Sequence, residues 1–359
     1  MKVPWWQVDM GESATSELLE VAENKSFSMG VYCKTFEENI AAYIGSDFAI
    51  GVTSGSDALL IALLGLEIKP GDKVLVQDRS WIAAANAIAL LGAVPIFVDV
   101  SNTSPTLSLA DLKAKYSADM KALVIAHMNG RHGDFEGIID FCNHKKLPLI
   151  EDAAQALGSK IGEKYLGTFG EIGCFSLSIA KIVGAGQGGF CITNNGELIE
   201  TLKGMRTHGT QDVFAARWQM LGFNFRLTDF HAAIASKQLL NLPERIVKSR
   251  LVYSSYLSMI SPLDFIHIIP MDFDKGEVGP YIEVEIAGGR SKFISYMQSH
   301  HVDVRPFYPA ISTALYLNGF GDTPNASRFA ENGVYLPSGP AITLEQIKYV
   351  CDLITNYPR

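Results

Sequence analysis

The sequence predicts an α/β fold with a mainly parallel sheet of seven strands, followed by a smaller α+β unit. Three observations support this prediction. Between residues 48 and 193, short β-branched or aromatic runs alternate with amphipathic segments. Strands separated by helices require crossover connections, which are typical of parallel sheets covered on both faces. The alternation stops near residue 195, and the length of 359 residues suggests two domains of ordinary size.

The elements expected up to residue 193 follow from hydrophobic periodicity. Two helices come first, around Ser16–Asn24 and over Thr35–Ile44. The seven predicted strands are Phe48–Val52, Lys73–Val76, Pro95–Val98, Leu123–Ala126, Leu147–Ile150, Cys174–Leu177 and Phe190–Thr193. The helices expected between them are Ala58–Leu64, Ala83–Leu91, Leu109–Tyr116 and Phe135–His144.

The rest of the chain reads as helices and a small mixed unit. The expected elements are helices at Glu197–Arg206 and Thr228–Leu242, a connecting helix at Glu244–Met259, a strand at Tyr281–Ile286, a helix at Ser291–His300, a short run at Val302–Phe307 and a last helix at Leu344–Asn356. We therefore expect an N-terminal segment and large domain over residues 1–243. The connecting helix and a small C-terminal domain are expected over residues 244–359.

Composition excludes several classes of function. With 48% hydrophobic and 19% charged residues, the chain resembles an ordinary globular protein. A net charge of −8 and the lack of a dense Lys/Arg block argue against nucleic-acid and anionic-membrane partners. Five scattered cysteines without a CxxC pair indicate neither a disulfide framework nor a zinc site, and predict a cytoplasmic protein. No signal-peptide core or uninterrupted membrane span is visible.

The most informative stretch runs from residue 149 to residue 190. A strand there leads into Glu151 and Asp152, with Gln155 three residues later. Such folds bind ligands at the carboxyl ends of parallel strands. The next strand leads through Ser176 to Lys181 and then to a glycine-dense loop at residues 184–189.

Lys181 lies among apolar neighbours, Ile179 to Val183. Desolvation lowers the pKa of a lysine toward the neutral, nucleophilic amine. A neutral lysine near a buried acid suits Schiff-base chemistry with pyridoxal phosphate (PLP), in which an Asp pairs with the ring nitrogen. Lys181 and Asp152 fit these roles. The alternatives are a helix-capping aspartate and a solvated lysine.

Other segments add possible ligand contacts. Gly55 and Ser56 open an apolar helix, whose free N–H groups form either a phosphate site or a simple helix start. A GxGxxG fingerprint and a P-loop lysine are both missing, which disfavours an NAD-dependent oxidoreductase and an NTPase. Trp81 follows the second strand and could stack on a flat ring or belong to the core. Asn224 and Arg226 could bind an anion or cap a helix.

The order of these motifs resembles the DegT/DnrJ/EryC1/StrS family of PLP-dependent sugar aminotransferases. Ser-Gly-Ser-Asp-Ala-Leu, Glu-Asp-Ala-Ala-Gln, Ser-x-x-x-x-Lys, Arg-x-His-Gly and Gly-x-Asn-x-Arg-x-Thr-Asp appear in sequence over nearly the whole chain. The resemblance implies PLP fold type I (aspartate-aminotransferase-like) and a homodimer with active sites between its subunits. It also implies L-glutamate as amine donor and a nucleotide-linked keto-sugar as acceptor.

The resemblance assigns roles by position. It implies that Lys181 binds PLP as an imine and moves the proton, and that Asp152 holds the pyridinium nitrogen. Gln155 is implied to bond the ring hydroxyl and Trp81 to stack on the ring. The phosphate contacts implied are Gly55, Ser56, Ser176 and, from the partner subunit, Asn224.

Two departures from the family pattern concern the sugar side of the expected pocket. The glycine loop carries Gln187 where Glu is commoner, and Asn129 stands where the family often has Tyr. A related branch of the family replaces the lysine by His and runs a dehydration. Because Lys181 is present, transamination is favoured here.

Within the family, the opening residues 3–12, the turn at 27–30 and the tail resemble perosamine-synthase-like members. Those enzymes aminate the 4-keto carbon of a GDP-linked 6-deoxysugar, as in O-antigen and surface-polysaccharide (lipopolysaccharide) synthesis. The candidate substrate contacts are Met29, Arg226, Arg305 and Tyr308. A 3-keto-sugar aminotransferase and a non-catalytic PLP or sugar-nucleotide sensor are the alternatives.

Overall fold

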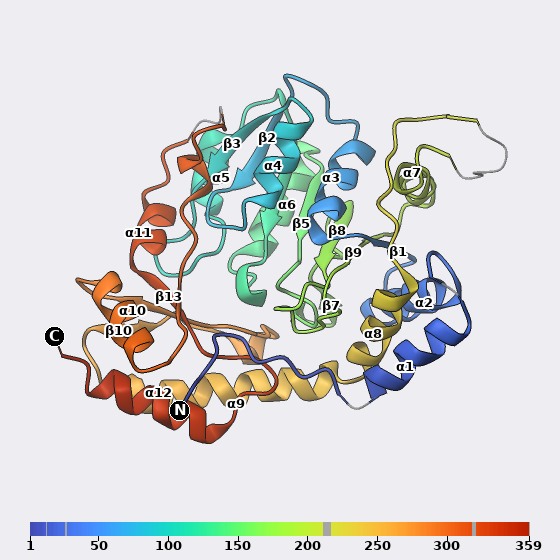
Figure 1. Ribbon diagram of the computed structural model, residues 1–359. Helices are drawn as coiled ribbons and strands as arrows, with labels where there is room; N and C mark the ends of the chain where they lie inside the picture. Colours follow the sequence, from blue (N-terminus) through green and yellow to red (C-terminus); the bar gives the residue numbers. More distant parts are fainter. Residues whose placement is uncertain (12, 26, 211–216, 318–320, 359) are drawn as a thin grey trace.

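A computed structural model describes residues 1–11, 13–25, 27–210, 217–317 and 321–358 (Figure 1). Within these residues, seven strands form one large sheet in the order β1-β9-β8-β5-β4-β2-β3. Their bounds are β1 Phe48–Val52, β2 Lys73–Gln77, β3 Val94–Val98, β4 Met120–Ala126, β5 Leu149–Asp152, β8 Ile172–Ser176 and β9 Gly189–Thr193. The predicted seven-stranded sheet is therefore confirmed.

The sheet is parallel except at one strand. β9 pairs antiparallel with both β8 and β1, whereas the pairs β5–β8, β4–β5, β2–β4 and β2–β3 are parallel. It follows that β1, β2, β3, β4, β5 and β8 all run in one direction. Their carboxyl ends consequently meet at a single edge of the sheet, where α/β folds bind ligands.

Helices cover both faces of the large sheet. One face packs against α2 (Val31–Ile44), α5 (Leu109–Lys115), α6 (Phe135–Lys145) and α8 (Asp229–Leu240). The other packs against α3 (Gly55–Gly65), α4 (Ala83–Leu90) and α7 (Gly196–Arg206). Within β4, Leu123 and Ile125 join the first core and Val124 joins the second. This alternation shows why buried parallel strands read as continuous apolar runs.

A second, four-stranded sheet lies toward the C-terminal end, in the order β10-β11-β13-β12. These strands span β10 Ile266–Ile268, β11 Ile282–Ile286, β12 Arg305–Pro306 and β13 Gly333–Leu336. Its core includes residues from α9 (Leu242–Ile260), α10 (Arg290–Ser299) and α12 (Leu344–Thr355). The long helix α9 runs beneath the molecule in Figure 1 and links α8 to the small sheet.

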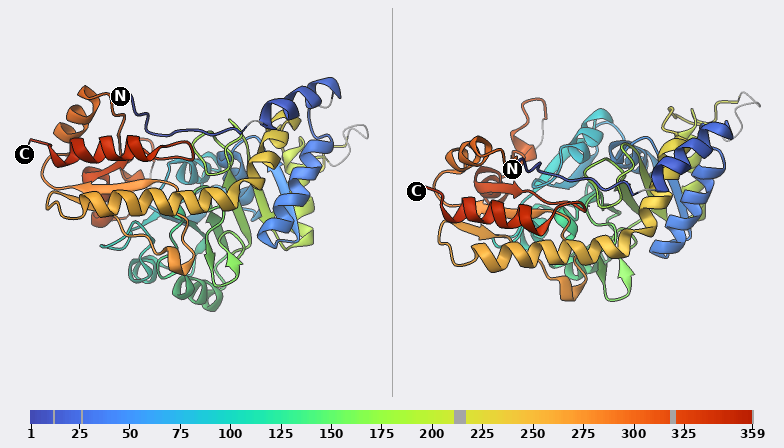
Figure 2. Two further views of the ribbon diagram at one scale, coloured as in Figure 1. Left: turned by 90° about the horizontal axis from the view of Figure 1, so that it is seen from below. Right: turned by 60° about the horizontal axis from the view of Figure 1, so that its bottom comes forward.

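The N-terminal segment crosses from the small sheet to the large one. Val3 is buried in the core of the small sheet and pairs with Val302, while Trp6 pairs with Ser338. Figure 2 shows this segment running along the molecule from the small sheet to α1 (Ser13–Glu23). Residues from the two ends of the chain thus lie side by side.

Several details differ from the sequence prediction. The strand predicted at 147–150 ends two residues later, so both carboxylates belong to β5. The run at 302–307 yields only the two-residue β12. The hairpin of β6 (Lys160–Ile161) and β7 (Lys164–Tyr165), the strands β10 and β13, and α11 (Pro324–Asn332) were not predicted. The strands β6, β7, β10 and β13 have only two to four residues, too few for hydrophobic periodicity to identify them. The helix α11 buries Ala326, Phe329 and Ala330 at helical spacing, so its pattern was present in the sequence and was missed. Among the described helices, none combines the length and apolarity needed to cross a membrane.

Candidate active site

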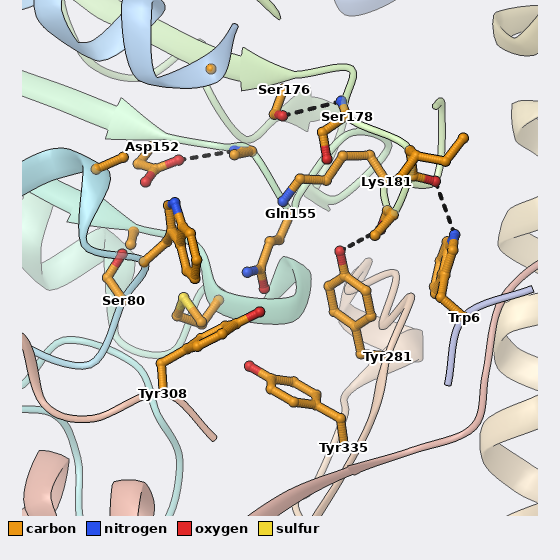
Figure 3. Close-up of a pocket in the computed structure, with 18 of the residues that line it drawn as sticks. Trp6, Ser80, Asp152, Gln155, Ser176, Ser178, Lys181, Tyr281, Tyr308 and Tyr335 are labelled. Atoms are coloured by element: carbon orange, nitrogen blue, oxygen red, sulfur yellow. Dashed lines mark hydrogen bonds between the residues drawn. The ribbon is translucent and has the colours of Figure 1, made fainter. Parts of the chain in front are cut away.

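A cavity of about 590 Å³ opens at the carboxyl edge of the large sheet. The loops that follow β1, β2, β4, β5 and β8 line it on one side, and the small sheet and the N-terminal segment line it on the other. Of the residues predicted from sequence, the cavity brings together Gly55, Ser56, Trp81, Asp152, Gln155, Ser176, Lys181, Arg305 and Tyr308. Figure 3 labels five of these, Asp152, Gln155, Ser176, Lys181 and Tyr308.

The first turn of α3 forms one end of the cavity. Ser54 caps this helix by accepting a hydrogen bond from the backbone N–H of Asp57 at 3.1 Å. The N–H groups of Gly55 and Ser56 belong to the same turn, and such groups have no partner inside their own helix. A helix N-terminus of this kind favours a phosphate.

Ser176 stands against the start of this helix. A Cβ at Gly55 would come within 2.8 Å of the Ser176 Cβ, so only glycine allows the close approach. The Ser176 hydroxyl oxygen accepts from the backbone N–H of Ser178 at 3.3 Å, which leaves its proton available for donation. The backbone and hydroxyl donors here fit the phosphate group of PLP.

Asp152 and Lys181 form the electrostatic centre of the site. Burial raises the pKa of Asp152, whereas its hydrogen bond from the Ala154 N–H, at 3.1 Å, favours the carboxylate. Burial lowers the pKa of Lys181 to about 8, and the charge of Asp152 opposes that shift. A lysine with this pKa holds a useful fraction of neutral amine near neutral pH. Figure 3 shows Lys181 reaching from its loop toward the middle of the cavity.

Glu151, the first of the two carboxylates, has a structural role. Its oxygens accept hydrogen bonds from three backbone N–H groups, those of Gly167, Phe169 and Gly170. It also bonds His127 Nε2 at 2.8 Å. A buried carboxylate with four such partners is satisfied where it stands. Glu151 therefore fixes His127 and the loop at 167–170.

Gln155 is oriented by the loop after β4. Its Oε1 accepts from the backbone N–H of Asn129 at 2.8 Å, so its NH₂ group is the end left for the cavity. Asn129 itself is buried and bonds the backbone of Tyr281 through both ends of its side chain. It does not line the cavity itself, so it would affect the sugar side only through Gln155 and Tyr281, which do.

The aromatic wall beyond β2 combines two predicted residues. Trp81 is 46% exposed, and its ring meets that of Tyr308 edge to face with centroids 4.5 Å apart. A tryptophan in a well-packed core would be far less exposed, so its ring is available for a ligand. Arg305 is also exposed, with its guanidinium 4.7 Å from the ring centroid of Trp5.

The cavity also has lining residues that were not predicted as site residues from sequence, among them Trp5, Trp6, Ser80, Tyr281 and Tyr335. Ser80 has a buried hydroxyl with no partner in the described residues. Burying a hydroxyl without a partner costs free energy, which marks it as a possible ligand contact. The adjacent residues Trp5 and Trp6 could have indicated from sequence that the N-terminal segment lines the cavity.

Three predicted residues lie outside this cavity. Asn224 pairs with Thr207 and accepts from Nε of Arg226 at 2.9 Å. The Met29 sulfur lies 3.8 Å from the Thr207 hydroxyl. Met29 and Asn224 thus lie beside Thr207, Arg226 is bonded to Asn224, and none of the three lines the cavity of its own chain.

Comparison with known proteins agrees with this geometry. The chain is 32% identical over 332 residues to a GDP-perosamine synthase from Escherichia coli O157:H7, covering 92% of this chain and 91% of the relative. It is 37% identical over 216 residues to a UDP-N-acetyl-3-dehydro-alpha-D-glucosamine 3-aminotransferase from Acidithiobacillus ferrooxidans, covering 60% and 58%. The aminotransferase TlmJ from Streptoalloteichus hindustanus superposes with a TM-score of 0.94 at 26% identity, covering 99% and 98%.

The family profile matches residues 8–355, which is nearly the whole chain. The cofactor of this family is PLP, and the donors at α3 and Ser176 together with the Asp152–Lys181 pair fit that group. The chain is a PLP-dependent enzyme that belongs to the DegT/DnrJ/EryC1/StrS aminotransferase family.

Proposed function

We propose that this enzyme transfers an amino group from L-glutamate to a nucleotide-linked keto-deoxysugar. The observation that carries the proposal is the convergence of Lys181, Asp152 and Gln155 on one cavity, with the pKa of the lysine lowered to about 8. The bound cofactor would supply the electron sink for carbanion chemistry. The protein supplies orientation, charge and proton transfer.

Each large-domain residue has a role in this proposal. Asp152 would pair with the ring nitrogen, and the NH₂ group of Gln155 would donate to the ring oxygen. Trp81 would cover the ring face. Lys181 would bind the cofactor and then move the proton between the substrate carbon and the neighbouring cofactor carbon. The phosphate would be held by Gly55, Ser56 and Ser176.

The acceptor would occupy the side of the cavity built by the small sheet. Arg305 and Tyr308 line that side, and their cationic and hydroxyl groups suit a sugar nucleotide. The GDP-perosamine synthase relative supports a 4-keto-sugar as substrate, because the match covers more than nine tenths of both chains. The 3-aminotransferase relative, at higher identity over a shorter alignment, keeps a 3-keto-sugar as the second candidate.

The proposal includes a homodimer in which each subunit completes the site of the other. Asn224 would reach the partner's cofactor phosphate, and Met29 and Arg226 would contact the partner's substrate. Around them the chain exposes large apolar side chains, which support an interface: Phe27, Met29, Val31, Trp218, Leu221 and Phe223.

The place of the reaction follows from the substrate proposed. A nucleotide-linked deoxysugar serves O-antigen or other surface-polysaccharide synthesis, as the perosamine-synthase resemblance implies. We place the enzyme in the cytoplasm, where thiols stay reduced. The five cysteines are all buried free thiols, which suits that compartment.

Two measurements test the proposal. The purified wild-type protein should carry the absorbance of bound PLP, and Lys181→Ala should lose the covalently held form. The protein should then be screened with L-glutamate against 3-keto and 4-keto sugars linked to GDP, UDP or dTDP, with 2-oxoglutarate release as the signal. A protein that binds PLP but releases no 2-oxoglutarate with any of them would be a sensor.

A further inference from the structure

The backbone around Lys181 is held by side chains from distant parts of the chain. The Trp6 indole N–H donates to the carbonyl of Ile179 at 3.1 Å. The Tyr281 hydroxyl donates to the carbonyl of Ala180 at 2.6 Å. The Lys181 loop is therefore bonded at the two residues that precede the lysine, as Figure 3 shows.

A third bond holds the residue after the lysine. Nη1 of Arg245 donates to the carbonyl of Ile182 at 2.7 Å, and its Nη2 donates to the carbonyl of Asp9 at 2.6 Å. Arg245 belongs to α9 and is buried, so this guanidinium joins the lysine loop to the N-terminal segment. Three side chains thus bond the backbone on both sides of Lys181 in the sequence, two before the lysine and one after it.

The loop needs such partners because it lacks regular structure. Residues 177–188 form neither helix nor strand between β8 and β9. Its carbonyl groups lack the partners that a helix or strand provides, and the buried one of Ile182 must find a partner elsewhere. A catalytic side chain also has to be held to about 0.5 Å, which a free loop does not provide.

The donors come from the opposite wall of the cavity. Trp6 is fixed by its pairing with Ser338 in the loop after β13, and the Tyr281 N–H is fixed by its 2.8 Å bond to Asn129 Oδ1. Both rings also pack against each other, with centroids 5.2 Å apart. Hydrogen bonds consequently connect the lysine loop to the wall of the cavity that would face the substrate.

We propose that Trp6, Tyr281 and Arg245 are positioning residues for Lys181, which hold its loop and couple it to the N-terminal segment and the small sheet. This inference builds on the proposed role of Lys181 as the cofactor-binding amine. None of the three acts on the reacting atoms in this proposal. They determine the position of the Lys181 amine and its exposure to water.

The test removes single hydrogen bonds. Tyr281→Phe and Trp6→Phe each delete one donor to the loop and keep an aromatic ring. The matched control is Tyr349→Phe, because the Tyr349 hydroxyl also donates to a backbone carbonyl, that of His300 at 3.1 Å, and this bond joins α12 to the end of α10 and not to the lysine loop. Tyr281→Phe and Tyr349→Phe each lose one tyrosine-to-carbonyl bond and keep the ring, so their general destabilisation is matched. Trp6→Phe also loses ring volume, so its thermal stability is measured beside the two readouts.

The first readout is the dissociation rate of PLP from the holoenzyme without substrate. We expect the two loop variants to release PLP roughly threefold to tenfold faster, the factor that one ordinary hydrogen bond gives. The second is the pH profile of PLP uptake by the apoprotein, whose midpoint should move upward because a looser loop admits water to the amine beside Asp152. Tyr349→Phe should change neither readout.

Two outcomes overturn the inference without touching the proposed function. Tyr281→Phe and Trp6→Phe could match Tyr349→Phe in both readouts, or could lower thermal stability while leaving PLP release and the pH midpoint unchanged. Either result would make these residues simple links between parts of the chain. Failure of the proposed function would instead appear as covalent PLP binding that persists in Lys181→Ala.

Discussion

Gln155 Oε1 accepts a hydrogen bond from the backbone N–H of Asn129 at 2.8 Å, and this contact decides which end of the amide faces the cavity. A backbone N–H can only donate, so the amide oxygen must turn toward it. The NH₂ group is then presented to the cavity as a donor. Asn129 stays in place because its own side chain bonds Tyr281 across the cavity wall.

Gln155→Glu should weaken PLP binding. The new carboxylate can still accept from the Asn129 N–H, but it replaces a donor by a negative charge where the ring oxygen is proposed to lie. Losing a hydrogen bond to a charged group costs about 1.5–3 kcal/mol, which corresponds to roughly tenfold to a hundredfold in affinity. Absorbance titration of the apoprotein with PLP measures this loss.

Gln187→Glu is the control for that experiment. Gln187 lines the same cavity and is exposed, so the same chemical change occurs in solvent and away from the ring contacts proposed here. It should leave PLP affinity within about twofold, as surface substitutions usually do. Equal losses in both variants would show that charge in the cavity matters and that the Asn129–Gln155 contact does not.

The large sheet could be predicted because its signals are local. In β4, residues 123 to 125 are all apolar, and they alternate between the two cores of the sheet. A strand that is buried on both faces can therefore be recognised in the sequence from four or five consecutive apolar residues. Asp152 and Lys181 could be placed at the sheet edge for the same reason, since each follows such a run.

The other wall of the cavity could not be predicted because its contacts are not local. Trp6 and Ile179 are 173 positions apart, and Tyr281 and Ala180 are 101 apart. No periodicity links such residues, and their types alone are equally suited to a core. Asn129 is a polar residue at a site motif, and only the structure shows that it is buried and links Gln155 to Tyr281.

The rate at which the apoprotein takes up PLP should depend on pH through Lys181. Its pKa is lowered to about 8 by burial, and only the neutral amine is a nucleophile. Below that value the neutral fraction falls with falling pH, so the rate should drop about tenfold for each pH unit. Above it the rate should level off. Stopped-flow absorbance from pH 6 to pH 10 measures the profile, and a midpoint near the ordinary lysine value would contradict the burial argument.

Asp152→Asn should separate binding from catalysis. The side chain keeps its shape and can still accept from the Ala154 N–H, but it carries no charge to hold a proton on the ring nitrogen. We expect the turnover number to fall roughly a hundredfold to ten-thousandfold, the range of a lost acid–base contribution. PLP should still bind through Lys181, as its absorbance would show.

Thermal stability gives an independent check on the same variant. Burial raises the pKa of Asp152, so its carboxylate is costly to bury in the apoprotein. Replacing it by a neutral amide should leave the melting temperature of the apoprotein unchanged or slightly higher. A large drop in melting temperature would instead assign Asp152 to the support of the fold.

Glu283 should be among the most costly residues to neutralise. It lies fully buried between Arg131, to which it is bonded directly, and Arg79, whose Nη2 is 3.8 Å away. Glu283→Gln would leave two buried guanidinium groups without a counter-charge, and such broken pairs cost about 3–5 kcal/mol. The surface pair Arg250–Asp274 provides the control, because its side chains are 58% and 82% exposed and Asp274→Asn should cost at most about 1 kcal/mol. Urea unfolding of the apoproteins measures both changes. Similar small losses for the two variants would mean that water or ions screen the Arg79–Glu283–Arg131 cluster in solution.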